Sequence, residues 1–232
     1  MQLSKRLSRV ASFVTEGNRL ADIGTDHGYI PIYLVKNGKV SYAYAMDINK
    51  GPLERAKEHI LEEGLETKIE TRLSNGLDKL YLDEADTVLI AGMGGALTID
   101  ILERGKEVLA SVKELVLSPH SEWMEVRMYL CKQGYEIVKE DMLIDADKYY
   151  VIYKAINNTE FVQDYSSLEY KFGRHLLNEK NEVLKAYLEK EKDKINLIME
   201  NLKNNSSTKV DERMKELKEE LEDVEKALLI LN

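Results

Sequence analysis

A short segment near the N-terminus combines acidic residues and glycines at a spacing that suits ligand binding. It reads Ala21-Asp22-Ile23-Gly24-Thr25-Asp26-His27-Gly28-Tyr29-Ile30-Pro31, and it begins within an apolar run. Glycine accepts positive φ and lets a ligand approach the backbone closely. A strand that ends in such a loop, with a helix after it, presents free N–H groups to a ligand. The segment predicts a binding loop; a tight turn without a ligand is the alternative.

An acidic residue inside the loop indicates which ligands suit it. The pattern D-x-G-x-D-x-G cannot be read as the G-x-G-x-x-G of dinucleotide sites, because Asp26 takes the place of the middle glycine. A carboxylate there opposes a pyrophosphate and suits a positively charged ligand. S-adenosylmethionine carries both an ammonium and a sulfonium. The candidate contacts of this cofactor in the loop are Asp22, Gly24, Thr25 and Gly28.

Three later loops, each following an apolar run, supply further candidate cofactor contacts. Asp47 ends the second run, where an acidic residue can hold both ribose hydroxyls. Each loop also has a structural alternative: a surface aspartate, an Asn-Gly turn, or a methionine that fills the core. In an open α/β sheet all these loops share the edge where ligands bind. The candidates are Asp47, Ile48, Asn75, Gly76, Ala91, Gly92, Met93 and Gly94.

A fourth loop, Leu117-Ser118-Pro119-His120, follows the fifth apolar run. Pro119 stiffens it, and His120 is placed to face the cleft as a substrate contact, although a lone loop histidine is more often an ordinary loop residue. A basic cluster of Lys5, Arg6 and Arg9 lies just before the first run and is a candidate for phosphate contacts. The alternative for this cluster is a solvated helix face.

The pattern of apolar runs predicts the sheet that would position these loops. Helical patterns separate most of the runs, as in a doubly wound parallel sheet. The last two runs are joined only by Asp145-Ala146-Asp147, so they should form an antiparallel hairpin. Six parallel-type strands with one reversed last strand are typical of the class I (Rossmann-like) methyltransferase fold. The expected strands are Arg19–Ile23, Ala43–Asp47, Ile69–Leu73, Thr87–Ala91, Glu114–Ser118, Tyr135–Leu143 and Lys148–Ala155.

Beyond residue 156 the sequence becomes helical and highly charged. Two series of apolar residues follow heptad spacing, separated by the polar stretch 204–208, and predict an antiparallel coiled-coil hairpin. We therefore expect a cofactor-binding domain over residues 1–156 and a helical domain over residues 157–232. The arm is either self-contained or grips a large substrate or a second subunit. The expected seam is Leu177, Leu184, Leu188, Ile195, Ile198, Leu202, Val210, Met214, Leu217, Leu221, Val224, Leu228 and Leu231, with Asn181 and Glu191 as interruptions.

Composition limits the cellular compartment and the kinds of partner that the sequence suits. The chain of 232 residues has a net charge of −9, which argues against nonspecific coating of nucleic acid. Its single cysteine, Cys131, forms no intrachain disulfide and fits a reducing cytoplasm. No signal peptide is evident, and no stretch approaches the ~20 apolar residues of a membrane span. We expect no metal site and a monomer or weak dimer.

The quoted residues resemble the bacterial tRNA (adenine-22-N1)-methyltransferases, the TrmK family. The match lies in Asp22–Pro31, Gly51-Pro52, Asn75-Gly76-Leu77 and Ile90–Gly95, with similar segments at Leu3–Leu7 and Glu140–Tyr149. The resemblance implies a class I fold, S-adenosylmethionine, and methyl transfer to adenine N1 in the D-arm region of tRNA. In that family the loop at residues 117–120 usually reads Leu-Gln-Pro and a small polar residue. In this chain the loop reads Leu-Ser-Pro-His, and this difference weakens any role that the resemblance implies for Ser118 or His120.

Adenine N1 attacks a methyl group with its own in-plane lone pair, so alignment matters more than a strong base. Asp26 is the first candidate to favour the developing cation by accepting a hydrogen bond from N6–H, or it holds the cofactor ammonium. His27 and Tyr29 are candidates to orient or stack the target base, which must be flipped out of a helix. The alternatives are a small-molecule methyltransferase and a catalytically silent RNA-binding module. A third, an NAD-dependent oxidoreductase, is disfavoured by the missing glycine pattern.

Overall fold

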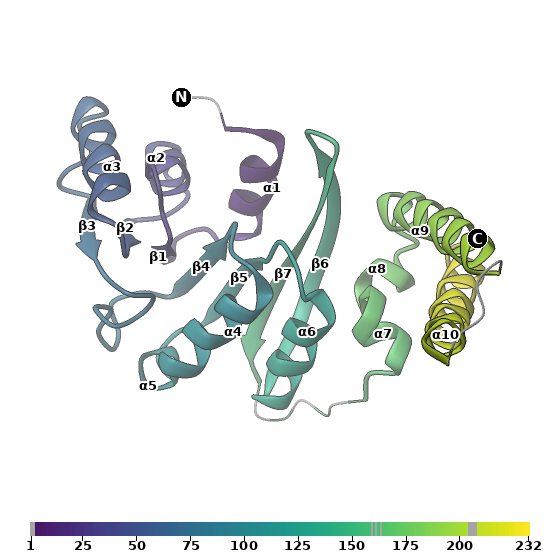
Figure 1. Ribbon diagram of the computed structural model, residues 1–232. Coiled ribbons are helices and arrows are strands. Elements are labelled where there is room, and N and C mark those ends of the chain that lie inside the picture. The colour runs from purple at the N-terminus through teal and green to yellow at the C-terminus, as the bar shows by residue number, and fades with distance from the viewer. Residues whose placement is uncertain (1–2, 159, 161, 163, 204–207) are drawn as a thin grey trace. The chain divides into compact units, whose positions relative to one another are not determined.

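The computed structural model describes residues 3–158, 160, 162, 164–203 and 208–232. The chain is divided into two compact units, which comprise residues 1–163 and residues 164–232. The first unit contains a sheet with helices on both faces, with α1, α2 and α3 on one side and α4, α5 and α6 on the other (Figure 1). These helices are α1 (Lys5–Phe13), α2 (Tyr29–Lys36), α3 (Lys50–Glu62), α4 (Gly95–Arg104), α5 (Lys106–Leu109) and α6 (Trp123–Lys132).

The sheet has seven strands in the order β3-β2-β1-β4-β5-β7-β6. All neighbours are parallel except β7, which is antiparallel to both β5 and β6. This confirms the predicted fold class and its reversed last strand. The strands are β1 (Arg19–Ile23), β2 (Tyr42–Asp47), β3 (Ile69–Leu73), β4 (Thr87–Ala91), β5 (Glu114–Ser118), β6 (Tyr135–Asp145) and β7 (Lys148–Asn157).

The hairpin of β6 and β7 extends further than the sequence pattern indicates. Its strands pair as far as Asp145 and Lys148, and the two residues between them, Ala146 and Asp147, have φ of 47° and 61°. Two successive positive φ values are typical of the tight turns whose twist matches an antiparallel pair. The reversed strand lies between β5 and β6, so β6 forms one edge of the sheet, and β3 forms the other.

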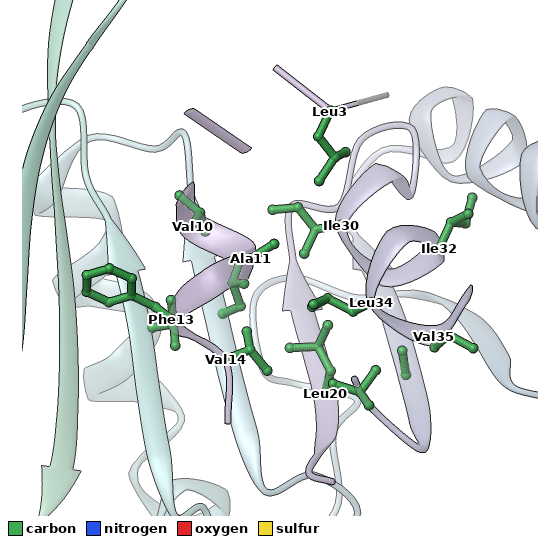
Figure 2. Packing of buried hydrophobic residues seen from close by; sticks show 14 of the residues in the cluster. Leu3, Val10, Ala11, Phe13, Val14, Leu20, Ile30, Ile32, Leu34 and Val35 are labelled. Atoms are coloured by element: carbon green, nitrogen blue, oxygen red, sulfur yellow. The ribbon is translucent and has the colours of Figure 1, made fainter. Parts of the chain in front are cut away.

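Helix α1 is the element that connects the N-terminus to this sheet. Ser4 caps it by accepting a hydrogen bond from the backbone N–H of Leu7 at 3.2 Å. Its apolar side, including Val10 and Phe13, is buried against α2 and the sheet. Figure 2 shows these side chains in one cluster with residues of α2 and β1. The basic residues Lys5, Arg6 and Arg9 are not part of this buried side.

The described residues of the second unit form four helices, where the sequence pattern predicts a two-helix hairpin. They are α7 (Ser167–Phe172), α8 (Arg174–Asn178), α9 (Glu182–Leu202) and α10 (Thr208–Leu231). Helices α9 and α10 pack against each other, and Lys192 pairs with Glu225 between them at 2.8 Å. Residues 204–207 of the predicted polar break lie outside the described residues. The coiled-coil geometry of this pair stays a prediction.

Two positions in the predicted seam have a different role in the structure. Leu177 belongs to the separate helix α8, and Asn181 does not interrupt a helix but begins one. The side chain of Asn181 accepts hydrogen bonds from the backbone N–H groups of Val183 and Leu184, which is how asparagine caps a helix N-terminus. The heptad pattern gave no sign of this helix start, because the leucines on both sides of Asn181 are buried and keep the heptad spacing.

A buried ion pair links α6 to β6 and offers a test of the fold. Arg127 and Glu140 are 2.7 Å apart, with side chains 1% and 0% exposed. We expect Glu140→Ala to lower the free energy of unfolding by about 3–5 kcal/mol, because it leaves an uncompensated buried charge. The double variant Arg127→Met/Glu140→Leu should recover most of the loss. Urea denaturation measures both, and a single variant within about 1 kcal/mol of the native protein would contradict this account.

Candidate functional site

A cleft lies where the loops after β1, β4 and β5 meet the start of α1 and of α2. Its volume is about 220 Å³. This edge is formed by the carboxyl ends of the parallel strands, as expected for ligand sites in open α/β sheets. The cleft is lined by Arg6, Leu7, Asp22, Gly24, Thr25, Asp26, Tyr29, Ile30, Ala91, Gly92 and His120.

The loop after β1 depends on residues with positive φ. Gly24 and Gly28 have φ of 73° and 71°, and Asp26, which is not glycine, has φ of 51°. Part of the expectation for this loop is wrong: several of its N–H groups are not free. Those of Gly24 and Thr25 donate to the carbonyl of Met46, and that of Gly28 donates to Thr25. The loop therefore offers a ligand mainly its side chains and a close backbone approach.

Gly24 also carries a packing constraint from the loop after β4. A Cβ atom at this position would lie 2.3 Å from Cε of Met93. The thioether end of Met93 therefore covers Gly24 and brings the β1 and β4 loops together. Met93 and Gly94 do not line the cleft directly, whereas Ala91 and Gly92 do.

Asp47 is held at the end of β2 by backbone hydrogen bonds. Its Oδ1 accepts from the N–H of Asn49 at 2.8 Å, and its Oδ2 accepts from the N–H of Asp26 at 3.3 Å. The residue is 7% exposed. Each oxygen has a further lone pair, so the carboxylate is oriented and still able to accept from two hydroxyls. Next to it Ile48 is 59% exposed, which leaves an apolar surface for a flat ring.

Asn75 and Gly76, both predicted as cofactor contacts, have different environments in the loop after β3. Asn75 is exposed, and its Oδ1 accepts from Arg104 at 3.5 Å. Gly76 is buried, and a Cβ there would lie 3.0 Å from the side chain of Ile101. Gly76 thus permits close packing beneath α4, and neither residue lines the cleft.

Asp22 is the buried carboxyl group of the cleft. It is 4% exposed, and it accepts a hydrogen bond from Thr25 Oγ1 at 2.6 Å. Burial raises the pKa of Asp22 to about 7, with a smaller contribution from the nearby charge of Asp47, and the bond from Thr25 opposes the shift. A cation beside Asp22 would favour its charged form.

Asp26 differs from Asp22 in its surroundings. Its side chain is 63% exposed and lies 3.5 Å from Arg55 and 3.6 Å from Nε2 of His27. It lines the cleft from the solvent side. The two carboxylates therefore occupy different positions, one deep and one at the mouth.

The two predicted base-stacking residues belong to an aromatic cluster. His27 and Tyr29 stack with ring centroids 5.1 Å apart and an interplanar angle of 8°. His59 of α3 stacks with both, at 5.7 Å and 5.6 Å, and its Nδ1 lies 3.0 Å from the carbonyl oxygen of His27. Tyr29 lines the cleft, but His27 does not.

The three basic residues of α1 have separate environments. Arg6 lines the cleft. Arg9 instead pairs with Asp141 of β6, and Lys5 is exposed outside the cleft. The structure thus does not bring the cluster together on one surface of the cleft.

The loop after β5 contributes one of its two predicted residues to the cleft. His120 lines it, whereas Pro119 is buried and its carbonyl accepts from Trp123 Nε1 at 3.0 Å. The ring of His120 meets that of Tyr150 edge-on at 5.6 Å. Burial lowers the pKa of His120, and Arg6 and Lys148 lower it further, so its neutral form is favoured.

Sequence reasoning missed five residues at or beside the site. Two apolar residues complete the cleft lining, one tyrosine comes from β7, and two residues of α3 contact the β1 loop. The tyrosine and the α3 residues gave no motif signal, because only tertiary packing brings them to this edge. They are Leu7, Ile30, Tyr150, Arg55 and His59.

The described part of the chain contains no group of three or more histidine, cysteine, aspartate or glutamate side chains placed to hold a metal ion. It also contains no helix of sufficient length and apolar character to cross a bilayer.

Comparison with known proteins assigns the chain to a family. Residues 3–153 match a family described as a methyltransferase domain. Over 226 residues the chain is 35% identical to the tRNA (adenine(22)-N(1))-methyltransferase of Bacillus subtilis, covering 96% of this chain and 95% of that protein. The chain belongs to the TrmK family. The resemblance drawn from the sequence motifs is confirmed.

Solved structures of TrmK relatives share the whole architecture. Mycoplasma capricolum TrmK, solved with S-adenosyl-homocysteine, superposes with a TM-score of 0.88 at 30% identity, over all of both chains. A Streptococcus pneumoniae protein solved with S-adenosyl-L-methionine also has a TM-score of 0.88, at 33% identity, covering 98% of this chain and 100% of the other. The likeness thus includes the helical unit at the C-terminus.

The orientation of Asp47 leads to a binding prediction. We expect Asp47→Ala to weaken binding of S-adenosylhomocysteine and S-adenosylmethionine equally, by ~2–3 kcal/mol or about 30- to 150-fold, because charge-assisted bonds to the ribose are lost. Isothermal titration calorimetry measures both affinities. Asp100→Ala, which removes a carboxylate paired with Arg104 on α4, is the control. Unchanged affinity for both ligands would remove Asp47 from the site.

The buried carboxyl group of Asp22 leads to a stability prediction. Its pKa is raised from the ordinary 3.8 to about 7. The protonated carboxyl group therefore contributes to the free energy of unfolding below pH 3.8, and this contribution is lost as the pH rises through about 7. We expect Asp22→Asn to avoid this loss and to exceed the native free energy of unfolding by up to roughly 4 kcal/mol near pH 8. Urea denaturation across pH measures it. A difference between the two proteins that does not grow with pH contradicts the prediction.

Proposed function

We propose that this protein transfers a methyl group from S-adenosylmethionine to N1 of adenine 22 in the D-arm region of tRNA. One observation carries the proposal: the family motifs around Asp22 and Gly92 line a single cleft, in a chain aligned over 96% of its length with a tRNA (adenine(22)-N(1))-methyltransferase. A tRNA substrate places the enzyme in the cytoplasm.

The residues of the cleft, together with Asp47 and Ile48, which lie beside it at the end of β2, suit the cofactor. Asp47 is oriented to accept from ribose hydroxyls, and Ile48 offers an apolar face to the adenine ring. Asp22 provides a buried carboxyl group for the ammonium of the cofactor. Ala91 and Gly92 permit close approach of the methionine part of the cofactor. When bound, the cofactor supplies an electrophilic methyl group on a sulfonium.

The two carboxylates suit different tasks. Asp22 is deep and buried, so a fixed ammonium suits it, whereas Asp26 lies at the mouth beside Tyr29. We assign Asp26 to the target base, where its carboxylate accepts from N6–H and favours the positive charge that develops when N1 attacks. Tyr29 is the ring against which the base is oriented, and His27 and His59 hold Tyr29 in place by stacking with it. No side chain has to remove a proton before attack.

The substrate base must leave its helix to reach this cleft. We assign Lys5 and His120 to contacts with the RNA around the base, because Lys5 is exposed on α1 and His120 lies at the cleft. The helical unit over residues 164–232 is assigned to holding the body of the tRNA. A small-molecule methyltransferase gains no evident use from such a unit.

The direct test is methylation of an unmodified tRNA transcript. We expect the protein and isotopically labelled S-adenosylmethionine to yield labelled 1-methyladenosine, detected by mass spectrometry of digested nucleosides. A transcript with guanosine in place of adenosine 22 is the control and should yield none. Methylation of a small molecule but not of tRNA supports the small-molecule alternative, and cofactor binding without any methylation supports a silent RNA-binding module.

Truncation separates the roles of the two units. We expect residues 1–163 to bind S-adenosylhomocysteine as the full chain does, because the cleft lies entirely in that unit. The kcat/KM for tRNA should fall by on the order of tenfold or more. Circular dichroism checks that the shortened protein is folded. Equal turnover of tRNA by both forms would show that the helical unit is not a substrate clamp.

A further inference from the structure

One face of α3 covers the loop after β1 at the mouth of the cleft. Ala56 of this face is buried, and a Cβ atom on Gly28 would lie 3.2 Å from the Cβ of Ala56. Nδ1 of His59 lies 3.0 Å from the carbonyl oxygen of His27. Arg55 precedes His59 by one turn, and residues four apart share a helix face. The packing of α3 therefore holds Arg55 beside the same loop.

The guanidinium of Arg55 is only loosely paired. Its Nη2 lies 3.5 Å from Oδ1 of Asp26, and the two side chains are 46% and 63% exposed. Among the described residues this is the one ion pair that Arg55 forms. By contrast, Arg19 and Arg127 contact carboxylates at 3.0 Å and 2.7 Å, and those carboxylates are buried. Pairs between exposed side chains contribute little to stability, so Arg55 can exchange Asp26 for another anion at small cost.

The surroundings of Arg55 indicate which anion suits it. The rings of His27, Tyr29 and His59 lie in nearly parallel planes, and Tyr29 lines the cleft. Unpaired nucleotide bases stack on such rings, and the planar fork of an arginine matches the oxygens of a phosphate. Nη1 of Arg55 lies 3.7 Å from where a Cβ atom of Gly51 would be, so this neighbour leaves the guanidinium uncovered. The mouth of the cleft thus combines a stacking surface with a donor for phosphate oxygens, as one nucleotide of an RNA strand requires.

We propose that Arg55 binds a backbone phosphate next to the target adenosine and releases Asp26 when it does so. The inference rests on the proposed function, in which the carboxylate of Asp26 accepts from N6–H of the base. In this structure Oδ1 of Asp26 faces Arg55, whereas Oδ2 lies 3.6 Å from Nε2 of His27. Transfer of the guanidinium to a phosphate leaves Oδ1 for the base, while His27 continues to orient Oδ2. Binding of the RNA strand and release of the acceptor then occur together.

The first test separates RNA binding from chemistry and from cofactor binding in the full chain. We expect Arg55→Ala to raise the KM for an unmodified tRNA transcript roughly 10-fold or more, the usual range for a lost charge-assisted contact. Its kcat should stay within about twofold of the native value, because no guanidinium then competes for Asp26. Calorimetry without RNA should give the native affinity for S-adenosylhomocysteine. Arg55→Lys should fall between Arg55→Ala and the native protein, because an ammonium keeps the charge but not the fork.

Lys57→Ala is the matched control. It removes the same charge from the same helix, but two residues of an α-helix turn its side chain about 200° away from Arg55. The KM, the kcat and the affinity for S-adenosylhomocysteine should all stay near their native values. An equal rise in KM for Lys57→Ala and Arg55→Ala would show only a diffuse attraction of RNA and would overturn the proposed contact.

The second test changes the RNA. Neutral methylphosphonates replace, one at a time, the two phosphates that flank adenosine 22 in a synthetic tRNA. We expect one of them to weaken binding to the native protein as much as Arg55→Ala does, and to have no further effect on that variant. The slope of log Kd against log salt concentration should also fall by about one for Arg55→Ala. Independent losses from the two changes overturn the assignment.

Other results overturn the proposal and assign a different role. If Arg55→Ala lowers kcat and leaves the KM for tRNA unchanged, Arg55 acts through Asp26 and not on a phosphate. If the variant binds S-adenosylhomocysteine more weakly and has a lower Tm, the residue supports the cofactor site or the local fold. If the native protein itself forms no 1-methyladenosine, the proposed function fails, whereas the results above all require an active native protein.

Discussion

The end of β2 is the constraint on which the site depends. The carbonyl of Met46 accepts from Gly24 and Thr25, and the next residue, Asp47, accepts from Asp26. These bonds hold the loop after β1 in a conformation with three positive φ values. Asp26 is not glycine, so its left-handed conformation costs free energy, and the hydrogen bonds to Met46 and Asp47 offset this cost by fixing the loop. As a result Asp22, Asp26 and Asp47 are fixed at one edge of the sheet, with Asp22 and Asp47 buried and Asp26 exposed.

Different surroundings give these three similar side chains different chemistry. Burial raises the pKa of Asp22 to about 7, so its charge depends on a cation nearby. Asp47 is oriented by two amides, and Asp26 remains exposed beside Arg55 and His27. A reaction that needs alignment and stabilisation of a cation, but no strong base, is served by such an arrangement.

The reversed strand β7 helps to position Arg6, one of the residues that line the cleft. Because β7 lies between β5 and β6, the long hairpin turns at Ala146 and Asp147 and brings Asp145 and Tyr150 to α1. Arg6 is thereby held at the loop of Gly92. The feature that marks the fold class thus also positions a cation in the cleft.

The sequence alone determined the fold class, the strands and the loops at the carboxyl edge of the sheet. Apolar runs of five or six residues bounded by glycine and acidic residues are local signals, and a sheet of parallel strands brings their ends to one edge. The aspartates at the ends of β1 and β2 were identified for the same reason. Confirmation of the TrmK resemblance followed from motifs in those same loops.

The tertiary structure alone decided which candidates meet. Heptad spacing could not show that Asn181 caps a helix, because leucines continue on both sides of it. Three cations in five residues looked like one cluster, yet Arg9 pairs with Asp141 more than a hundred positions away and Arg6 lies in the cleft. Tyr150 and His59 carry no motif and reach the site through the hairpin and α3. Spacing along a chain determines local conformation, but contacts between distant segments depend on packing, which no local pattern encodes.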